Sequence, residues 1–249
     1  MAYTNIDKPE DFFSATLYTG DGSADQSMTG AGFKPDFLWI KRRNASERHV
    51  LTNVQMGVSD GAYKWLDSAA TNAEFSGGTG VAAFDADGFS IKTSDTTWNA
   101  SGSTYVFWSW KANGGTTATN TSGTVDSVVQ ANTVAGFSIA LATAPSSNGV
   151  WSFGHGLGVK PDMVITKQRS GGGWWTWHKD LANQTTYYLG LNQTDAQTNE
   201  SNMWGGGMTS SVIGVSSPNS TLTNQPYIAY CFASKQGYSK FGKYVANAV

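Results

Sequence analysis

Short runs of β-branched and aromatic residues, separated by Gly, Asp and Asn, recur along the whole chain. Runs of this length between turn residues are typical of β-strands. An amphipathic helix would need apolar residues at positions i, i+3 and i+4 over about ten residues, and the Gly and Asn interruptions leave no such stretch. The pattern therefore predicts an all-β protein. In the first half of the chain the expected strands are FSATLY (13–18), FLWIKRR (37–43), YKWLDS (63–68), FSIKTS (89–94) and TYVFWSWKA (104–112).

The pattern of the first half occurs again in the second half. GFKPDFLWIKRR (32–43) is matched by GVKPDMVITKQR (158–169), with the same Lys-Pro-Asp turn and the same Lys-x-Arg end. We infer an internal duplication, and a repeat of about 100 residues with many short strands has the size of a β-sandwich or a jelly roll. Two further pairs match in the same order, DFFSATLYTGDG (11–22) with GFSIALATAPSSNG (136–149) and STYVFWSWKA (103–112) with QPYIAYCFAS (225–234).

The duplication sets the expected domain boundaries. Two tandem β-sandwiches are expected, with an N-terminal arm, a linker and a C-terminal strand outside them. The first half of the linker is rich in Gly, Thr, Asn and Ser, and its second half is expected to form a strand. The last segment begins with Gly-Tyr-Ser, so the chain is expected to stop one strand into a further copy. The expected ranges are 1–12 for the arm, 13–112 and 137–235 for the sandwiches, 113–136 for the linker and 236–249 for the C-terminal strand.

The order of these motifs resembles a family of virion proteins. The motifs are FS…YTGDG, GFKPDFLWIK, an aromatic strand with a polar loop, DADGFS and NASGSTYVFWSWKA, and the second half adds GHGLGVKPDMVITK and GYSKFG. This order is similar to the tandem concanavalin-like or SPRY-like β-sandwich repeats in virion proteins of tailed bacteriophages of marine bacteria. The resemblance extends over nearly the whole chain. It implies a module of a capsid surface, a fibre or a tail appendage, and it implies no particular ligand.

Composition and charge narrow the classes of partner. The 249 residues carry a formal net charge of −2, and only 14% of them are charged. A chain with this balance has no general attraction to nucleic acid or to anionic lipid, so neither is an expected partner. No apolar run approaches the ~18 residues of a membrane span, and the N-terminus has no signal-peptide pattern, so synthesis in a host cytoplasm without membrane insertion is expected. The single cysteine, Cys231, lies in an apolar run and is expected to be a buried free thiol.

Few residues are suited to catalysis. Of the histidines, His155 is flanked by glycines and is expected in a turn, and His49 follows a charged loop and is expected at the surface. No sequence motif of a nucleophile, a zinc site or a carboxylate pair is present. The sequence therefore predicts a non-enzymatic protein without a cofactor, although a glycosidase whose two carboxylates lie far apart in the sequence would escape this test.

Two Asp-rich turns have the close spacing of oxygen ligands that a Ca²⁺ site uses. They are DGSAD (21–25) and DADG (85–88). A two-residue hairpin turn explains the second one without a metal, and the second repeat has no counterpart of it. We therefore expect no metal.

The segment SGGGWWTWHKD (170–180) has the most unusual local composition in the chain. Aromatic rings can stack on the apolar faces of sugars, and a neighbouring His, Asn or Asp can bind sugar hydroxyls. In a strand, however, Trp175 and Trp177 face away from Trp174 and Thr176, so one set can belong to a core or to a subunit interface. Both interpretations stay open, and Trp174 is the residue expected to be exposed. The candidate glycan-binding residues are Trp174, Trp175, Trp177 and His178.

The basic residues of the repeated motif have two interpretations. Lys41 and Arg43 share one face of their expected strand, and the same spacing recurs at Lys167 and Arg169. A cluster on one face can bind phosphate. We favour a solvated strand end, or an ion pair with a turn carboxylate such as Asp36.

The sequence predicts a non-enzymatic structural protein of a bacteriophage virion, located in a capsid decoration, a fibre or a tail appendage and used for surface display or host attachment. Its expected partners are other virion proteins, bound through residues 1–12 and 236–249, and further copies of itself. Strand addition to a neighbouring subunit is one mode that these segments allow. The alternative is a lectin-like module that binds host surface glycans, and a polysaccharide depolymerase is the third hypothesis.

Overall fold

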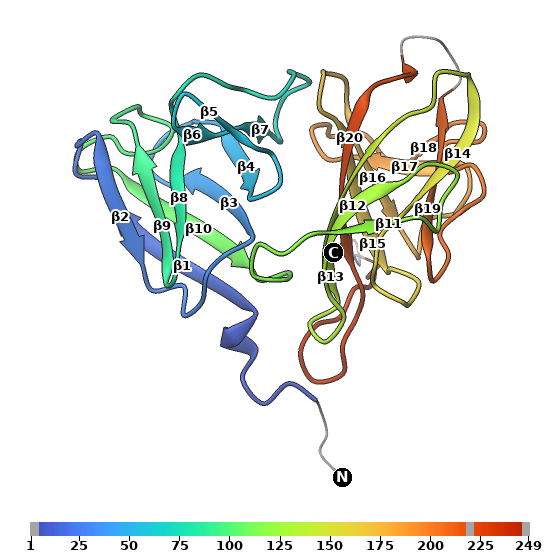
Figure 1. The fold of residues 1–249 in the computed structure, drawn as a ribbon, viewed down its shortest axis with the longest axis horizontal. Coiled ribbons are helices and arrows are strands. Elements are labelled where there is room, and N and C mark those ends of the chain that lie inside the picture. The colour runs from blue at the N-terminus through green and yellow to red at the C-terminus, as the bar shows by residue number, and fades with distance from the viewer. Residues whose placement is uncertain (1–4, 218–221, 246–249) are drawn as a thin grey trace. The chain divides into compact units, whose positions relative to one another are not determined.

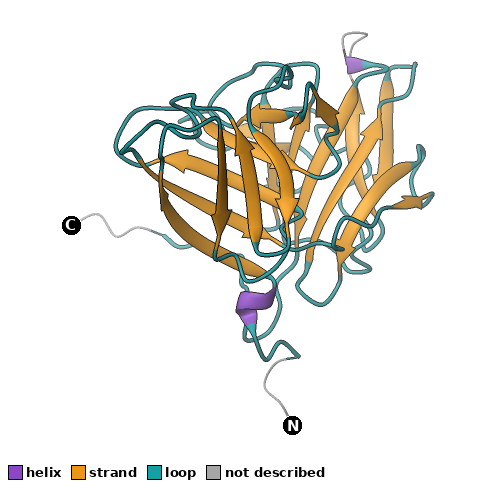
Figure 2. Ribbon diagram, turned by 60° about the vertical axis from the view of Figure 1, so that its left-hand side comes forward, coloured by secondary structure: helices purple, strands orange, loops and turns teal. Residues whose placement is uncertain are grey.

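Figures 1 and 2 show a computed structural model of the protein, which describes residues 5–217 and 222–245. Regular structure in these residues is almost entirely β-strand, and helical structure is limited to short turns such as the 3₁₀ turn Pro9–Asp11. The predicted all-β fold is confirmed. No helix in the described part is long and apolar enough to cross a membrane.

The chain divides into two compact units, which we call the N-terminal and the C-terminal unit. The N-terminal unit comprises Lys8–Thr117 and the separate segment Lys167–Trp174. The C-terminal unit comprises Ala118–Thr166 and, among the described residues, 5–7, 175–217 and 222–245. The segment 167–174 thus belongs to the N-terminal unit, although its sequence lies within the second repeat.

Two sheets form the N-terminal unit and share one core. Strand β10 is buried at every second residue, as the alternation of its sequence predicts. The core contains Leu38 and Phe107 from the larger sheet and Met28 and Phe89 from the smaller one. The larger sheet has the order β1 (Phe13–Thr19), β10 (Thr104–Trp110), β3 (Phe37–Arg42), β4 (His49–Asn53) and β7 (Trp65–Asp67). The smaller sheet has the order β2 (Asp25–Thr29), β9 (Gly88–Lys92) and β8 (Val81–Asp85), and β5 (Val58–Ser59) and β6 (Ala62–Tyr63) form a hairpin.

The C-terminal unit also has two sheets around one core. Its core contains Val164 and Trp177 from the larger sheet and Trp151 and Ile213 from the smaller one. Cys231 is buried in this core as a free thiol, as predicted, and burial raises its pKa to about 12. The larger sheet has the order β11 (Ala118–Asn120), β12 (Ser127–Asn132), β13 (Phe137–Thr143), β20 (Pro226–Phe232), β15 (Met163–Gln168), β16 (Trp174–His178), β17 (Tyr187–Gly190) and β18 (Thr198–Asn199). The smaller sheet pairs β14 (Gly149–Gly154) with β19 (Val212–Ser217).

The two larger sheets contain the same strand order. The order β1-β10-β3-β4-β7 of the N-terminal unit corresponds to β13-β20-β15-β16-β17 of the C-terminal unit. The registers correspond as well, because Phe13 lies opposite Trp110 and Phe137 lies opposite Phe232. This agreement supports the duplication inferred from the sequence. The copies differ at one edge, where β12 and β11 extend the sheet beyond β13, and no strand of the described residues lies beyond β1.

The expected linker, 113–136, contains two strands of the larger sheet. Strand β12 pairs with β13 from Ser127 to Asn132, and β11 pairs with β12. The strand expected in the second half of the linker is confirmed. Its composition did not reveal that a second strand, β11, lies in the Thr-rich half.

The expected C-terminal strand forms a turn in its described part. The N–H of Lys235 donates to the carbonyl O of Ser239 at 2.9 Å, and Gly237 between them has a φ of +77°, which a strand does not accommodate. Residues 246–249 of this expected strand, and residues 1–4 of the expected arm, lie outside the described residues.

Candidate functional site

The aspartate of the first Lys-Pro-Asp turn binds the backbone that follows the closing strand β10. Pro35 precedes β3, where a missing N–H removes no hydrogen bond from the sheet. Asp36 is fully buried, and its carboxylate accepts three backbone hydrogen bonds. Such charge-assisted hydrogen bonds are stronger than neutral ones, so they hold the segment after β10 against the Lys-Pro-Asp turn. The donors are the N–H groups of Ala112 (2.7 Å), Gly114 (2.9 Å) and Gly115 (2.6 Å).

The second Lys-Pro-Asp turn has the same role with fewer bonds. The N–H of Asp162 donates to the carbonyl O of Phe232 at 2.7 Å, as the N–H of Asp36 donates to that of Trp110 at 2.9 Å. The carboxylate of Asp162 accepts the N–H of Ser234 at 2.6 Å. Because Ser234 follows β20 closely, both turns bind the corresponding part of their repeat.

The lysine of the repeated motif binds carbonyl oxygens of the loop that follows its strand. The Nζ of Lys41 donates to two of them at 3.2 and 2.8 Å. The Nζ of Lys167 donates to two at 2.8 and 2.7 Å. The carboxylate of Asp36 is occupied by backbone N–H groups, so the ion pair that we favoured there is not formed. Lys41 and Lys167 instead stabilise the loops of their own hairpins through these hydrogen bonds.

Lys167 is fully buried, and both of its hydrogen bonds go to neutral carbonyl groups. Burial therefore lowers the pKa of its amine from the ordinary 10.5 to about 8. Between these two values the unfolded chain keeps a proton that the folded chain has released. Lys167 therefore makes the free energy of unfolding rise with pH between pH 8 and 10.5. Below about pH 8 the lysine is charged in both states, and the buried charge lowers the free energy of unfolding by its largest amount.

Lys167→Met is expected to remove this pH dependence. The wild type should gain about 3 kcal/mol in the free energy of unfolding, relative to the variant, as the pH rises through this window. Urea unfolding of both proteins at a series of pH values measures the difference. Lys34→Met, at an exposed position, is the control and should run parallel to the wild type. Parallel curves for Lys167→Met as well would contradict the prediction.

Trp175 and Trp177 face the core of the C-terminal unit. Trp177 has no exposed surface, and its indole N–H donates to the carbonyl O of Gln184 at 2.8 Å. Trp175 packs against the same core and meets the ring of Tyr188 edge-on, with the centroids 4.8 Å apart. The expected alternation along β16 is present, and both rings are engaged in packing.

Trp174 lies on the opposite face of β16 and is also fully buried. It belongs to the N-terminal unit, where its indole N–H donates to the carbonyl O atoms of Asp67 (2.9 Å) and Ala70 (3.1 Å). The expectation that Trp174 is exposed is wrong, because other residues of the N-terminal unit cover its ring. A sugar cannot stack on a ring without exposed surface, so Trp174 and Trp177 provide no glycan platform.

The tip of the β15–β16 hairpin is bound within the N-terminal unit through Glu74. The carboxylate of Glu74 lies 2.7 Å from Nη2 of Arg169 and 3.1 Å from Nζ of Lys64. Its backbone N–H donates to the carbonyl O of Arg169 at 2.8 Å. Nη2 of Arg169 also donates to the carbonyl O of Met56 at 3.1 Å. Arg169, the last residue of the motif in its second copy, thus binds the tip to the rest of the N-terminal unit.

A pocket of about 460 Å³ on the C-terminal unit contains the fourth candidate residue, His178. We call it the His178 pocket. The Nδ1 of His178 accepts the N–H of Asp180 at 3.1 Å, so a neutral ring carries its hydrogen on Nε2. The hydroxyl of Thr176 is buried and has no hydrogen-bond partner among the described groups. The polar lining residues are Thr176, His178, Asp180, Gln197 and Lys243, and the apolar ones include Met163, Leu181 and Leu189.

Part of the His178 pocket could have been found from the sequence. Thr176 and His178 are two positions apart on one strand, so they share a face. Gln197 comes from a loop whose position no local pattern reveals, and Lys243 comes from the C-terminal segment. Sequence reasoning therefore found one member of the pocket and missed the groups that surround it.

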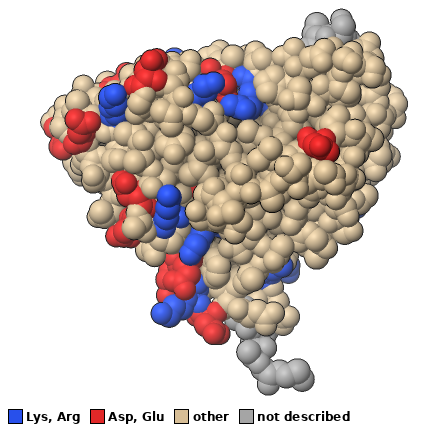
Figure 3. Space-filling model, in the orientation of Figure 1, with Lys and Arg blue, Asp and Glu red and all other residues tan. Residues whose placement is uncertain are grey.

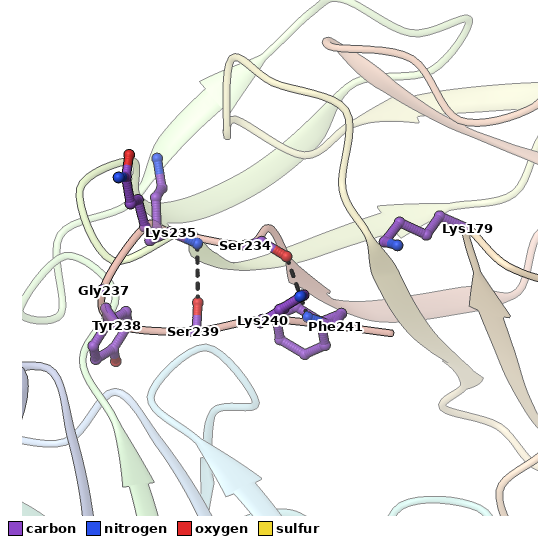
Figure 4. Close-up of a pocket in the computed structure, with 9 residues that line it drawn as sticks. Lys179, Ser234, Lys235, Gly237, Tyr238, Ser239, Lys240 and Phe241 are labelled. Atoms are coloured by element: carbon purple, nitrogen blue, oxygen red, sulfur yellow. Dashed lines mark hydrogen bonds between the residues drawn. The ribbon is translucent and has the colours of Figure 1, made fainter. Parts of the chain in front are cut away.

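A second pocket, of about 550 Å³, is formed by the C-terminal turn and Lys179 (Figure 4). The N–H of Phe241 donates to Oγ of Ser234 at 3.2 Å, and its ring lies 5.6 Å from that of Phe232. These contacts place the segment that follows the turn. The lining includes three lysines and no carboxylate, so this part of the surface is basic.

Residues 8–249 match a protein family described as a domain of unknown function (DUF7483). The chain belongs to this family. No curated protein and no solved structure matches the chain. The match begins at Lys8, where the N-terminal unit begins, and it extends over both units. DUF7483 therefore describes the pair of repeats and not one of them.

In each of the two Asp-rich turns of this DUF7483 chain, one carboxylate accepts backbone N–H groups. Within residues 5–217 and 222–245, no group of three or more His, Cys, Asp and Glu side chains is placed to hold a metal ion. The segment 85–88 is the two-residue turn between β8 and β9, and the carboxylate of Asp87 accepts two backbone N–H groups. Asp21 accepts the N–H of Ser23 at 2.7 Å, and this bond lowers its pKa.

The two histidines outside the His178 pocket are fully or partly buried. His155 lies in a loop, as expected, but it is fully buried, and burial lowers its pKa. Its Nδ1 accepts the N–H of Leu157 at 3.2 Å. His49, expected at the surface, is half-buried at the start of β4, and burial lowers its pKa as well.

Proposed function

We propose that this DUF7483 chain is a non-enzymatic structural protein of a bacteriophage virion, located on a capsid surface, a fibre or a tail appendage. One observation carries the proposal: the polar residues that recur in both repeats bind the backbone of the protein itself. Asp36 and Asp162 bind the segments that follow the closing strands, and Lys41 and Lys167 bind their own hairpin loops. Residues used in this way support a rigid scaffold.

The surface composition supports the same proposal. Figure 3 shows charged side chains gathered over the N-terminal unit and an almost uncharged face of the C-terminal unit. A surface of this kind favours packing against other proteins over binding to a polyanion. The proposed partners are other virion proteins and further copies of the chain, reached through the arm 1–12 and the C-terminal segment 236–249.

Particle proteomics tests the proposal. Particles of a phage that encodes this chain are purified on a density gradient, and each protein in the band is quantified by mass spectrometry. The chain should co-migrate with the major capsid protein at a fixed ratio in independent preparations, while a host ribosomal protein serves as the contaminant control. A chain that stays in the soluble fraction of the lysate would remove the virion assignment.

A second candidate function is binding of a host glycan in the His178 pocket. The unpartnered Thr176 hydroxyl favours it, because a buried polar atom without a partner is uncommon and a ligand hydroxyl can bond to it. His178, Asp180 and Gln197 add the donors and acceptors that sugars bind. This site is an alternative to the tryptophan platform that the sequence left open.

Ligand-detected NMR with a panel of monosaccharides tests the second candidate. At least one sugar should bind, and His178→Ala should weaken its binding by about tenfold, which corresponds to about 1.4 kcal/mol. His49→Ala is the control, since His49 lies in the other unit. If no sugar binds, or if both variants bind as the wild type does, the pocket is not a glycan site.

A further inference from the structure

Strand β1 forms an open edge at a position that is covered in the other copy. In the C-terminal unit, the corresponding strand β13 pairs with β20 on one side and with β12 on the other. In the N-terminal unit, β1 pairs with β10 on one side, and within the described residues no strand lies on the other (Figure 1). The duplication therefore identifies a site for one more strand.

The backbone groups at this edge are available for pairing. Gly20 donates its N–H to Ser103, and Phe12 accepts the N–H of Lys111, so the even-numbered residues of β1 bond to β10. In an antiparallel pair the residues between them point their N–H and C=O groups away from the partner. These residues are Phe13, Ala15, Leu17 and Thr19. Among the described residues, the one partner of their outward backbone groups is Nε2 of Gln26, which donates to the carbonyl O of Thr19 at 3.2 Å.

The side chains of β1 lack the features that usually protect an edge strand. Natural edge strands are blunted by Lys, Pro or a bulge, and β1 (FSATLYT) contains none of these. Leu17 is 59% exposed on its outer face. The corresponding Leu141 is half-buried, and Val128 of β12 lies opposite it. An added strand would cover Leu17 in the same way.

The charges around β1 indicate which kind of strand can pair with this edge. Exposed carboxylates flank β1 at both ends, with Glu10 and Asp11 before it and Asp21 and Asp25 after it. Antiparallel pairing of β1 with a second β1 would bring the like-charged ends together, which disfavours that pairing. A basic strand fits better.

The C-terminal segment 240–245 is basic, and all of its residues except the half-buried Phe241 are exposed. It carries Lys240 and Lys243 and no carboxylate, and Lys235 precedes it in the turn. Tyr244 and Val245 are 90% and 86% exposed, although both are residue types that favour strands. The segment thus combines a charge opposite to that of the β1 edge with uncovered apolar side chains.

We propose that residues 240–245 of a second copy of this chain add as a strand to the free edge of β1. The contact joins the β1 edge of one copy to residues 240–245 of another, so each copy keeps one surface for a further contact. Contacts of this kind repeat and build rings or open chains. Backbone hydrogen bonds supply the affinity, and Leu17 and the flanking carboxylates orient the strand. The proposal stands independently of the virion assignment.

Sedimentation velocity over a concentration series tests this contact in the full chain. The wild type should grow from 26.5 kDa to dimers and larger species, with a Kd between about 1 μM and about 1 mM. Ala15→Pro should abolish growth, because it removes an outward N–H and leaves the β10 pairing intact. Leu17→Lys should do the same by placing a cation at the edge. Circular dichroism and urea midpoints establish that the variants are folded.

Lys240→Glu with Lys243→Glu should also keep the protein monomeric. Lys34→Glu with Lys160→Glu makes the same change in net charge at exposed positions elsewhere, and this control should assemble as the wild type does. A mixture of Ala15→Pro with Lys240→Glu/Lys243→Glu should form a dimer and nothing larger, because one variant supplies the segment and the other supplies the edge.

Two results would overturn the proposal. A wild type that remains at 26.5 kDa up to about 1 mM shows that the edge recruits no second copy. Assembly of the double lysine variant to the same extent as the wild type shows that the edge binds something other than residues 240–245.

Discussion

Replacement of Trp174 by Ala is expected to lower the free energy of unfolding by about 4 kcal/mol, which is typical of a large aromatic side chain removed from a core. Trp174 is fully buried, and its indole N–H bonds to the carbonyl O atoms of Asp67 and Ala70. The variant loses the buried apolar area of the ring. It also leaves two carbonyl groups without their donor, which adds to the loss.

Urea unfolding monitored by circular dichroism measures this effect. Trp175→Ala removes the same side chain from the neighbouring position, where it is half-buried, and should lower the free energy of unfolding by about half as much. Any sugar that binds to the wild type should bind to Trp174→Ala with unchanged affinity. A stable Trp174→Ala variant that has lost glycan binding would restore the tryptophan platform and contradict the structure.

Asp36→Ala is expected to lower the free energy of unfolding by about 3 kcal/mol, since hydrogen bonds to a buried charged group contribute more than neutral ones. The carboxylate binds three backbone N–H groups, and its loss leaves them without an acceptor in a buried place. Asp36→Asn should also be destabilising, because the amide keeps the size of the side chain but presents NH₂ to at least one N–H donor.

Asp162→Ala provides the matched comparison. The carboxylate of Asp162 accepts one backbone N–H, from Ser234, and the residue is half-buried. Its removal should lower the free energy of unfolding by about 1 kcal/mol. Thermal or urea unfolding of both variants tests the order. Equal effects, or a larger effect at Asp162, would show that the number of hydrogen bonds does not set the role of the turn.

The strands and the duplication could be predicted because their signals are local. The first expected strand, 13–18, differs from Phe13–Thr19 of β1 by one residue. The alternation of apolar and polar positions and the Gly and Asn turns can both be recognised within a few consecutive residues. The matching strand order of the two larger sheets follows from the matching order of the motifs.

The burial of Trp174 could not be predicted because it depends on residues far away in the chain. Alternation correctly separated Trp174 from Trp175, but it does not say what covers each face of a strand. The carbonyl groups that bind Trp174 belong to Asp67 and Ala70, in the first repeat. The buried Asp36 is a similar case, since its donors follow β10 and no pattern near the turn indicates them.

The assignment of residues 167–174 to the N-terminal unit has a consequence for synthesis and for cloning. A ribosome that has made residues 8–117 has not yet made the segment that binds Glu74 and supplies Trp174, so the N-terminal unit is completed only after more than half of the chain exists. A gene fragment that ends at residue 117 would encode an incomplete unit. The two repeats share motifs and strand order, but the N-terminal unit is not complete at the sequence boundary of the first repeat.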